Sequence, residues 1–207
     1  MNFPVSTAQY LENKFLPYDP IVINGYCYNS EPENLNEYCE AFTKCSNWYY
    51  EFVNGFHEKY PEPEYKISDI VCYAKQEFGF DIQVYYLKDT SLKDKHSNFF
   101  GRWEWEDKSK KDLLKVFVNG YKPQWINRYT IPHEIFHGVM DIDVFFQDAL
   151  SKYSEDTKKR IIERIPEMTT AYLLAPPKYV YQLKREGVSD FKIAQMCNVS
   201  KCVISYT

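Results

Sequence analysis

Hydrophobic and polar positions follow a helical period between 33 and 78, before a period of two replaces it. From 33 to 60, apolar and aromatic residues recur every three or four positions, which predicts a long amphipathic helix. Pro61 and Pro63 should end this helix, because proline disrupts a continuing helical turn. A second amphipathic helix is predicted over 66–78, with Gly79 as its C-terminal stop.

The middle of the chain changes to a period of two. Alternation over 80–86 predicts a strand, and 98–106 and 113–118 are predicted as two more. The charged segment 107–112 suits a hairpin loop between the last two strands. This part of the chain therefore predicts a small three-stranded sheet.

The last third returns to a helical period. We predict one helix within 123–140 and a longer one over 154–175, with Ser154 as its N-cap. Shorter helices are predicted near 178–185, 189–196 and 200–206. Helices before and after a small sheet make the predicted fold class α+β.

The N-terminal part of the chain has a different character from the rest. Its first thirty residues show little periodicity and predict a loosely structured arm with one short helix at 6–15. We therefore divide the chain into a mostly helical N-terminal extension, 1–62, and a second domain, 63–207. The aromatic-rich segment 38–60 is expected to pack on the sheet or to cover a cleft, with an interaction face as the alternative.

Composition and charge limit the classes of partner. Hydrophobic residues make up 44% and charged residues 26%, as in ordinary globular proteins. The net charge of −4 argues against broad attraction to nucleic acid or to an anionic membrane. We see no signal peptide and no apolar run long enough to span a bilayer, so we expect a cytoplasmic protein without a membrane partner. No pattern indicates an oligomeric state.

The six cysteines do not form a C-x-x-C pair, so a thiolate zinc site has little support. Without a secretory signal, free thiols are expected rather than disulfides. Cys72 and Cys197 lie in periodic apolar stretches and are predicted to be core residues.

The pentapeptide His133-Glu134-Ile135-Phe136-His137 carries most of the chemical information in the chain. On a helix, two histidines four residues apart share one face and can bind the same metal ion. Zinc in hydrolases usually takes three protein ligands and leaves one position for water. Glu134 would act as general base on that water and then as general acid. The alternative is a surface helix without metal. His57 and His96 are predicted to be ordinary solvated or capping residues.

Three carboxylates are candidates for the third ligand: Asp141, Glu163 and Glu167. Asp141 follows His133 by eight residues, about 12 Å along a straight helix, which is too far for one tetrahedral ion. Glu163 and Glu167 lie on the next long helix. A simpler reading of Glu163 is an ion pair with Lys159.

The region from about 67 to 206 resembles the ImmA/IrrE metallopeptidases of bacteria, phages and mobile elements. The resemblance rests on four segments: Ile67 to Val84 as a helix–strand lead-in, Phe117-Val118-Asn119, Arg128 to Glu134 (like the family's Arg-Phe-Thr-x-x-His-Glu), and Leu173-Leu174-Ala175-Pro176 (like its Leu-Leu-Met-Pro). It implies a zincin-like metallopeptidase domain that binds Zn²⁺ and cleaves a regulatory protein such as a repressor or an antitoxin. It also implies Glu163 as the third ligand, beside His133 and His137, because the family's ligand precedes the last proline by thirteen residues.

The chain departs from the family pattern at three positions. Phe136 replaces a small glycine, which is expected to alter packing beneath the metal. Pro132 and Pro166 lie beside the expected ligands, so both helices should either kink or begin late. If the second helix begins near Pro166, Glu167 becomes the alternative third ligand.

The segment 188–204 resembles a helix-turn-helix, with Cys197-Asn198 as the turn. Its second helix carries one lysine and no other basic residue, so we expect packing against the core rather than DNA binding. The predicted function is thus a zinc-dependent endopeptidase. The alternative is a catalytically weak or inactive metal-binding regulator that acts through protein or DNA contacts.

Overall fold

The structure is a computed structural model that describes residues 21–23, 26–28, 32–61, 65–93 and 99–207. The predicted helix at 6–15 and His96 lie outside the described residues. Within the described part, the fold is α+β, as predicted, with eight α-helices and a three-stranded sheet.

The sheet contains β3 (Asp81–Leu87), β5 (Leu113–Asn119) and β4 (Gly101–Trp105), in that spatial order. β3 runs parallel to β5, and β4 runs antiparallel to it, so β4 forms one edge. A short 3₁₀ helix, η1 (Thr90–Lys93), follows β3. The sequence did not predict the antiparallel pair β1 (Ile21–Ile23) and β2 (Tyr26–Tyr28).

The helices agree with the sequence pattern to within two residues, except for one that the pattern missed. Gly79 ends its helix with φ 73°, and Ser154 caps another by accepting a hydrogen bond from the Thr157 N–H. The unpredicted helix is α5. In chain order the helices are α2 (Leu35–Lys59), α3 (Ile67–Phe78), α4 (Gln124–Ile142), α5 (Val144–Ser151), α6 (Glu155–Leu174), α7 (Pro177–Arg185), α8 (Asp190–Cys197) and α9 (Lys201–Tyr206).

Pro132 and Pro166 both lie inside continuous helices, at the ninth residue of α4 and the twelfth of α6. Neither helix begins late, so that part of the expectation is wrong. Both proline rings are buried, and packing offsets the backbone hydrogen bond that each proline removes. Since α6 starts three turns before Pro166, the condition that would favour Glu167 as a ligand does not hold.

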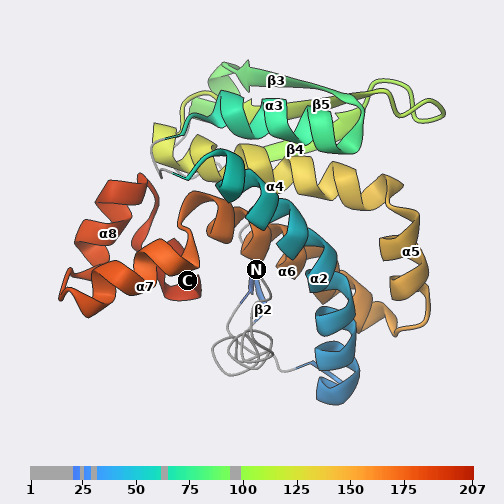
Figure 1. Ribbon diagram of the computed structural model, residues 1–207. Coiled ribbons are helices and arrows are strands. Elements are labelled where there is room, and N and C mark those ends of the chain that lie inside the picture. The colour runs from blue at the N-terminus through green and yellow to red at the C-terminus, as the bar shows by residue number, and fades with distance from the viewer. Residues whose placement is uncertain (1–20, 24–25, 29–31, 62–64, 94–98) are drawn as a thin grey trace.

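Helix α4 lies beneath the sheet, and α6 lies on the far side of α4 (Figure 1). α4 packs against β4, β5 and α6, and α6 in turn packs against α2. The inward residues of β5, Leu114, Val116 and Val118, are fully buried. At Gly138 the helix and sheet approach so closely that an added Cβ would lie 2.6 Å from the Leu114 Cδ1. α4 is therefore clamped between the sheet and α6.

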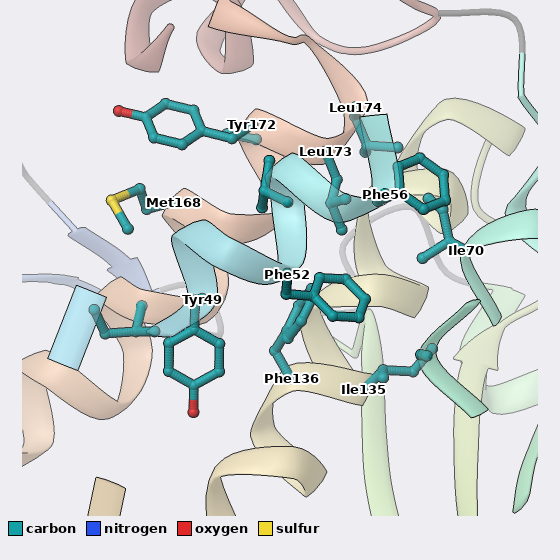
Figure 2. Packing of buried hydrophobic residues seen from close by; sticks show 14 of the residues in the cluster. Tyr49, Phe52, Phe56, Ile70, Ile135, Phe136, Met168, Tyr172, Leu173 and Leu174 are labelled. Atoms are coloured by element: carbon teal, nitrogen blue, oxygen red, sulfur yellow. The ribbon is translucent and has the colours of Figure 1, made fainter. Parts of the chain in front are cut away.

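Helix α2 packs against helices rather than on the sheet. It contacts α6, α5 and α3, and its aromatic residues belong to the same buried core as those of α4 and the sheet. The Phe136 ring, fully buried, meets Phe52 and Tyr49 edge to face, at centroid distances of 5.3 and 6.1 Å (Figure 2). Phe136 thus connects α4 to α2. The division at 62 stays a prediction.

Truncating Phe136 to alanine should lower the free energy of unfolding by about 3–5 kcal/mol, the usual cost of removing a buried aromatic ring. The ring fills space that Tyr49 and Phe52 cannot both reoccupy, since each is held by other aromatic neighbours. Urea denaturation followed by circular dichroism would measure the change. Phe145→Ala on α5, where the ring is 62% exposed, is the matched control and should cost less than 1 kcal/mol. Equal losses in the two variants would contradict the assigned packing.

Of the predictions about single residues, the one for Cys72 is wrong, and the one for His57 holds in its capping alternative. Cys72 is exposed, whereas Cys197 is buried as expected; on α3, Cys72 lies opposite the face that buries Ile70 and Ala74. His57 is half-buried rather than solvated, and its Nε2 lies 3.0 Å from the Tyr172 carbonyl oxygen in the last turn of α6, which agrees with the capping alternative. Among the described helices, none is both long enough and apolar enough to cross a bilayer.

Candidate metal centre

Two helices bring three potential ligand atoms together. His133 and His137 lie one turn apart on α4, and their Nε2 atoms are 3.1 Å apart. The Glu163 Oε2 of α6 lies 3.4 Å from the His137 Nε2 and 3.8 Å from the His133 Nε2. This carboxylate faces the histidines, and the described ion pairs do not include one between Glu163 and Lys159.

The triangle has the dimensions of a metal site. For zinc bound at about 2.0–2.1 Å, tetrahedral geometry separates two ligand atoms by about 3.3 Å. The three measured separations of 3.1, 3.4 and 3.8 Å bracket that value. Burial, and then the neighbouring His137, hold the pKa of His133 well below its usual range, so the ring is a neutral imidazole with a free lone pair. His133, His137 and Glu163 could therefore hold a metal ion.

The geometry follows from how α4 and α6 pack. Tyr129 donates its hydroxyl hydrogen to the Glu167 carbonyl oxygen, and His137 meets Glu163, so the two helices run antiparallel. Tyr129, His133 and His137 follow at four-residue spacing and form one stripe on α4. This stripe lies against the face of α6 that carries Glu163.

Glu134 lies on the side of α4 that faces the sheet, next to the edge strand β4. At Gly101 an added Cβ would lie 2.5 Å from the Thr130 Cγ2 and 3.2 Å from the Glu134 Cγ, so only glycine allows this approach. Burial raises the pKa of Glu134 to about 7; His137 opposes this shift and Glu163 adds to it. The Glu134 carboxylate therefore interacts electrostatically with His137 and Glu163, although it lies on a different face of α4.

The other two candidate carboxylates have other partners. Asp141 accepts hydrogen bonds from the Trp105 Nε1 at 3.0 Å and from the Lys111 Nζ at 2.7 Å. Glu167, one turn beyond Glu163, pairs with Arg164 across 3.6 Å, and both side chains are buried. Neither Asp141 nor Glu167 belongs to the group that could hold a metal.

Burial raises the pKa of Glu167 from 4.5 to about 7, and Arg164 offsets the effect only in part. Because the folded-state pKa is raised, this group stabilises the fold fully at low pH and loses that contribution as pH rises towards 7. We expect Glu167→Gln to gain stability relative to the unmodified protein, by about 1–3 kcal/mol, between pH 5 and pH 8. Urea unfolding at both pH values, with a chelator present, would measure the difference. If the difference in the free energy of unfolding between the two proteins is the same at pH 5 and pH 8, the raised pKa of Glu167 is contradicted.

Sequence reasoning missed two residues at the site. The Tyr129 ring stacks on the His133 ring at a centroid distance of 6.0 Å and an interplanar angle of 23°. Its position four residues before His133 was a signal that could have identified it. Gly101 was not identifiable, because its role depends on the approach of β4 to α4.

The helix-turn-helix-like tail packs on the core, as predicted. Asn198 forms the turn after α8 with φ 52°, and α9 buries Val203 and Ile204 on the side that meets α6. Between this tail and the start of α4 lies a hollow of about 520 Å³, which Trp125 and Phe191 help to line.

Comparison with models of known protein families gives no match, and neither does comparison with curated proteins. A solved structure with a similar fold is a transcriptional regulator of Mycobacterium tuberculosis, with a TM-score of 0.50 and 9% sequence identity. The match covers 82% of this chain and 50% of that protein, so this chain spans about half its length. At this identity the likeness concerns the fold alone.

Proposed function

We propose that the chain is a zinc-dependent endopeptidase. The observation that carries the proposal is the triangle of His133, His137 and Glu163, whose ligand atoms lie 3.1–3.8 Å apart, with Glu134 beside it. Two imidazoles and one carboxylate are a donor set that suits zinc and leaves one coordination position open. The proposal includes membership of the ImmA/IrrE metallopeptidases and a zincin-like domain.

The zinc ion and the residues around it have separate roles in the proposed reaction. Bound zinc would supply a Lewis acid that lowers the pKa of water and polarises a carbonyl group. Glu134 accepts a proton from the attacking water and returns it to the nitrogen of the leaving amine. The stack of Tyr129 on His133 fixes the imidazole plane, and the contact of α4 with α6 fixes Glu163. Each group is held on a helix rather than on a loop, which favours a constant geometry.

A polypeptide is the substrate class that the neighbouring edge strand favours. In the described part of the sheet, β4 pairs with β5 on one side and with no strand on the other. Phe100 and Glu106, which flank β4, form backbone hydrogen bonds with Asn119 and Leu113 of β5. The alternate residues Gly101, Trp103 and Trp105 therefore direct their backbone groups to the free edge. An extended chain could add to that edge, and Gly101 places it next to Glu134. A regulatory protein such as a repressor or an antitoxin fits this class.

Metal content and turnover test the proposal together. We expect the purified protein to retain about one zinc per chain and to cleave members of a mixed decapeptide pool, with new N-termini identified by mass spectrometry. A chelator should stop cleavage, and added zinc should restore it. Protein that takes up no zinc after gentle purification, or that hydrolyses the pool equally with and without the chelator, would refute the proposal.

A metal-binding regulator without turnover is the second candidate. The observation that favours it is the low exposure of the site: Glu134 is 7% exposed and His137 9%. Zinc binding without cleavage of any peptide would support this regulator. DNA contacts through α8 and α9 stay a prediction, and retention on a duplex-DNA column at low salt would test them.

A further inference from the structure

The hollow between the start of α4 and the α8–α9 pair exposes two large rings to water. Trp125 lies in the first turn of α4 and is 42% exposed, and Phe191 on α8 is 64% exposed. Val199 contributes to the apolar wall, and Asn198 and Lys201 are among its polar lining. A volume of about 520 Å³ falls within the range of ligand-binding pockets. We call this feature the Trp125 hollow.

The Trp125 hollow lies towards the N-terminus of α4 from the candidate metal centre. Trp125, Tyr129, His133 and His137 follow each other at four-residue spacing along α4. Tyr129 lies between the hollow and the site, where its ring stacks on His133. At a rise of 1.5 Å per residue, Trp125 is about 12 Å along the helix axis from His133.

The charge of the hollow indicates what it would bind. Among the described residues that line it, Lys201 is the charged one, and its side chain is exposed at the start of α9. Among the ion pairs of the described residues, none involves Lys201. An occupant with a large apolar side chain beside a carboxylate would complement both the rings and the ammonium group.

We propose that the Trp125 hollow is a recognition subsite for the polypeptide substrate. It takes a large apolar side chain with an acidic neighbour, about four residues from the bond held at the metal centre, because an extended chain advances about 3.3 Å per residue. This inference rests on the proposed endopeptidase function, and it assigns the sequence preference of that function to Trp125, Phe191 and Lys201.

A peptide library measures the preference without turnover. The probes are fluorescent decapeptides that carry Phe beside Asp, Lys or Ser, and binding to Glu134→Gln protein is read by anisotropy. We expect Phe-Asp peptides to bind best, and Trp125→Ala or Phe191→Ser, added to Glu134→Gln, to weaken them about tenfold. Lys201→Glu should transfer the preference to Phe-Lys peptides. Phe145→Ser removes an equally exposed ring from α5 and should change nothing.

The outcomes separate this inference from the proposed function. Cleavage by the otherwise unmodified protein about four residues from the Phe supports both. If Phe-Asp peptides bind in the expected way but none is cleaved, the endopeptidase proposal fails and the binding site stands. If peptides are cleaved and the Trp125, Phe191 and Lys201 variants show the original preference, the subsite is refuted and the endopeptidase stands. All these residues are exposed, so folding should be preserved, and circular dichroism would verify this.

Discussion

Glu134→Gln should reduce peptide hydrolysis by about 10²–10⁴-fold, the usual contribution of a general base, while zinc content stays at one per chain. Glutamine keeps the shape of the side chain, but its amide cannot accept a proton from water. Glu134 is 7% exposed and lies beside Gly101, so a smaller residue would also open a cavity and confuse the result. Initial rates on the decapeptide pool, with zinc measured in the same preparation, would give both numbers.

The matched control is Glu51→Gln, which changes an exposed carboxylate on α2. Its rate should equal that of the unmodified protein within a factor of two or so, as for most exposed substitutions. If Glu134→Gln retains more than a tenth of the activity with zinc bound, Glu134 is not the base. If it loses the zinc as well, Glu134 takes part in binding the metal, and the division of roles proposed above is wrong.

The sequence predicted the helices and strands in which apolar residues are regularly spaced, and it missed those in which the spacing is irregular or too short to recognise. The long helix α2 and the strands of the sheet show clear spacing of buried positions. α5 does not, because Val144 and Phe145 are exposed while Phe146 and Leu150 are buried, so apolar residues do not mark one face. β1 and β2 have three residues each, too few to establish alternation.

Local rules failed where tertiary packing decided the outcome. The expectation that proline makes a helix begin late was wrong at Pro132 and Pro166, since both rings are buried between elements that hold the helices in place. Phe136 was expected only to alter packing near the metal. Its actual partners, Phe52 and Tyr49, are more than eighty residues earlier in the chain, and no local pattern joins them.

At the candidate site, too, the residues that depend on local spacing could be predicted, and those that depend on tertiary contacts could not. The histidine pair follows from helical spacing alone, so the sequence was sufficient for it. The choice between Glu163 and Glu167 was not local, since they lie one turn apart on one helix and differ in what faces them. Glu163 faces the histidines, and Glu167 pairs with the buried Arg164.

Exchanging these two glutamates for glutamine should therefore give opposite results. Glu163→Gln should weaken zinc binding by more than about a hundredfold, because it replaces a charged ligand with a neutral amide. Changes to groups that only hydrogen-bond to a ligand already cost about 10–100-fold. Glu167→Gln should keep about one zinc per chain, since its carboxylate faces Arg164 at 3.6 Å rather than the histidines. Competition with a fluorescent zinc chelator would measure both affinities at pH 7.5.

The two variants are matched, because each removes one carboxylate charge from α6 and keeps the side-chain volume. Loss of stability cannot account for the expected difference in zinc affinity between the two variants. Burial already disfavours the charged form of Glu167, so a neutral amide is tolerated there. Glu163 is only half-buried, so an amide at that position is easier still to accommodate. His137→Ala should lose zinc together with Glu163→Gln, as the two ligand atoms are 3.4 Å apart. If Glu167→Gln loses the zinc and Glu163→Gln keeps it, α6 must be shifted along its axis by about one turn in the metal-bound protein, and Glu167 is the third ligand.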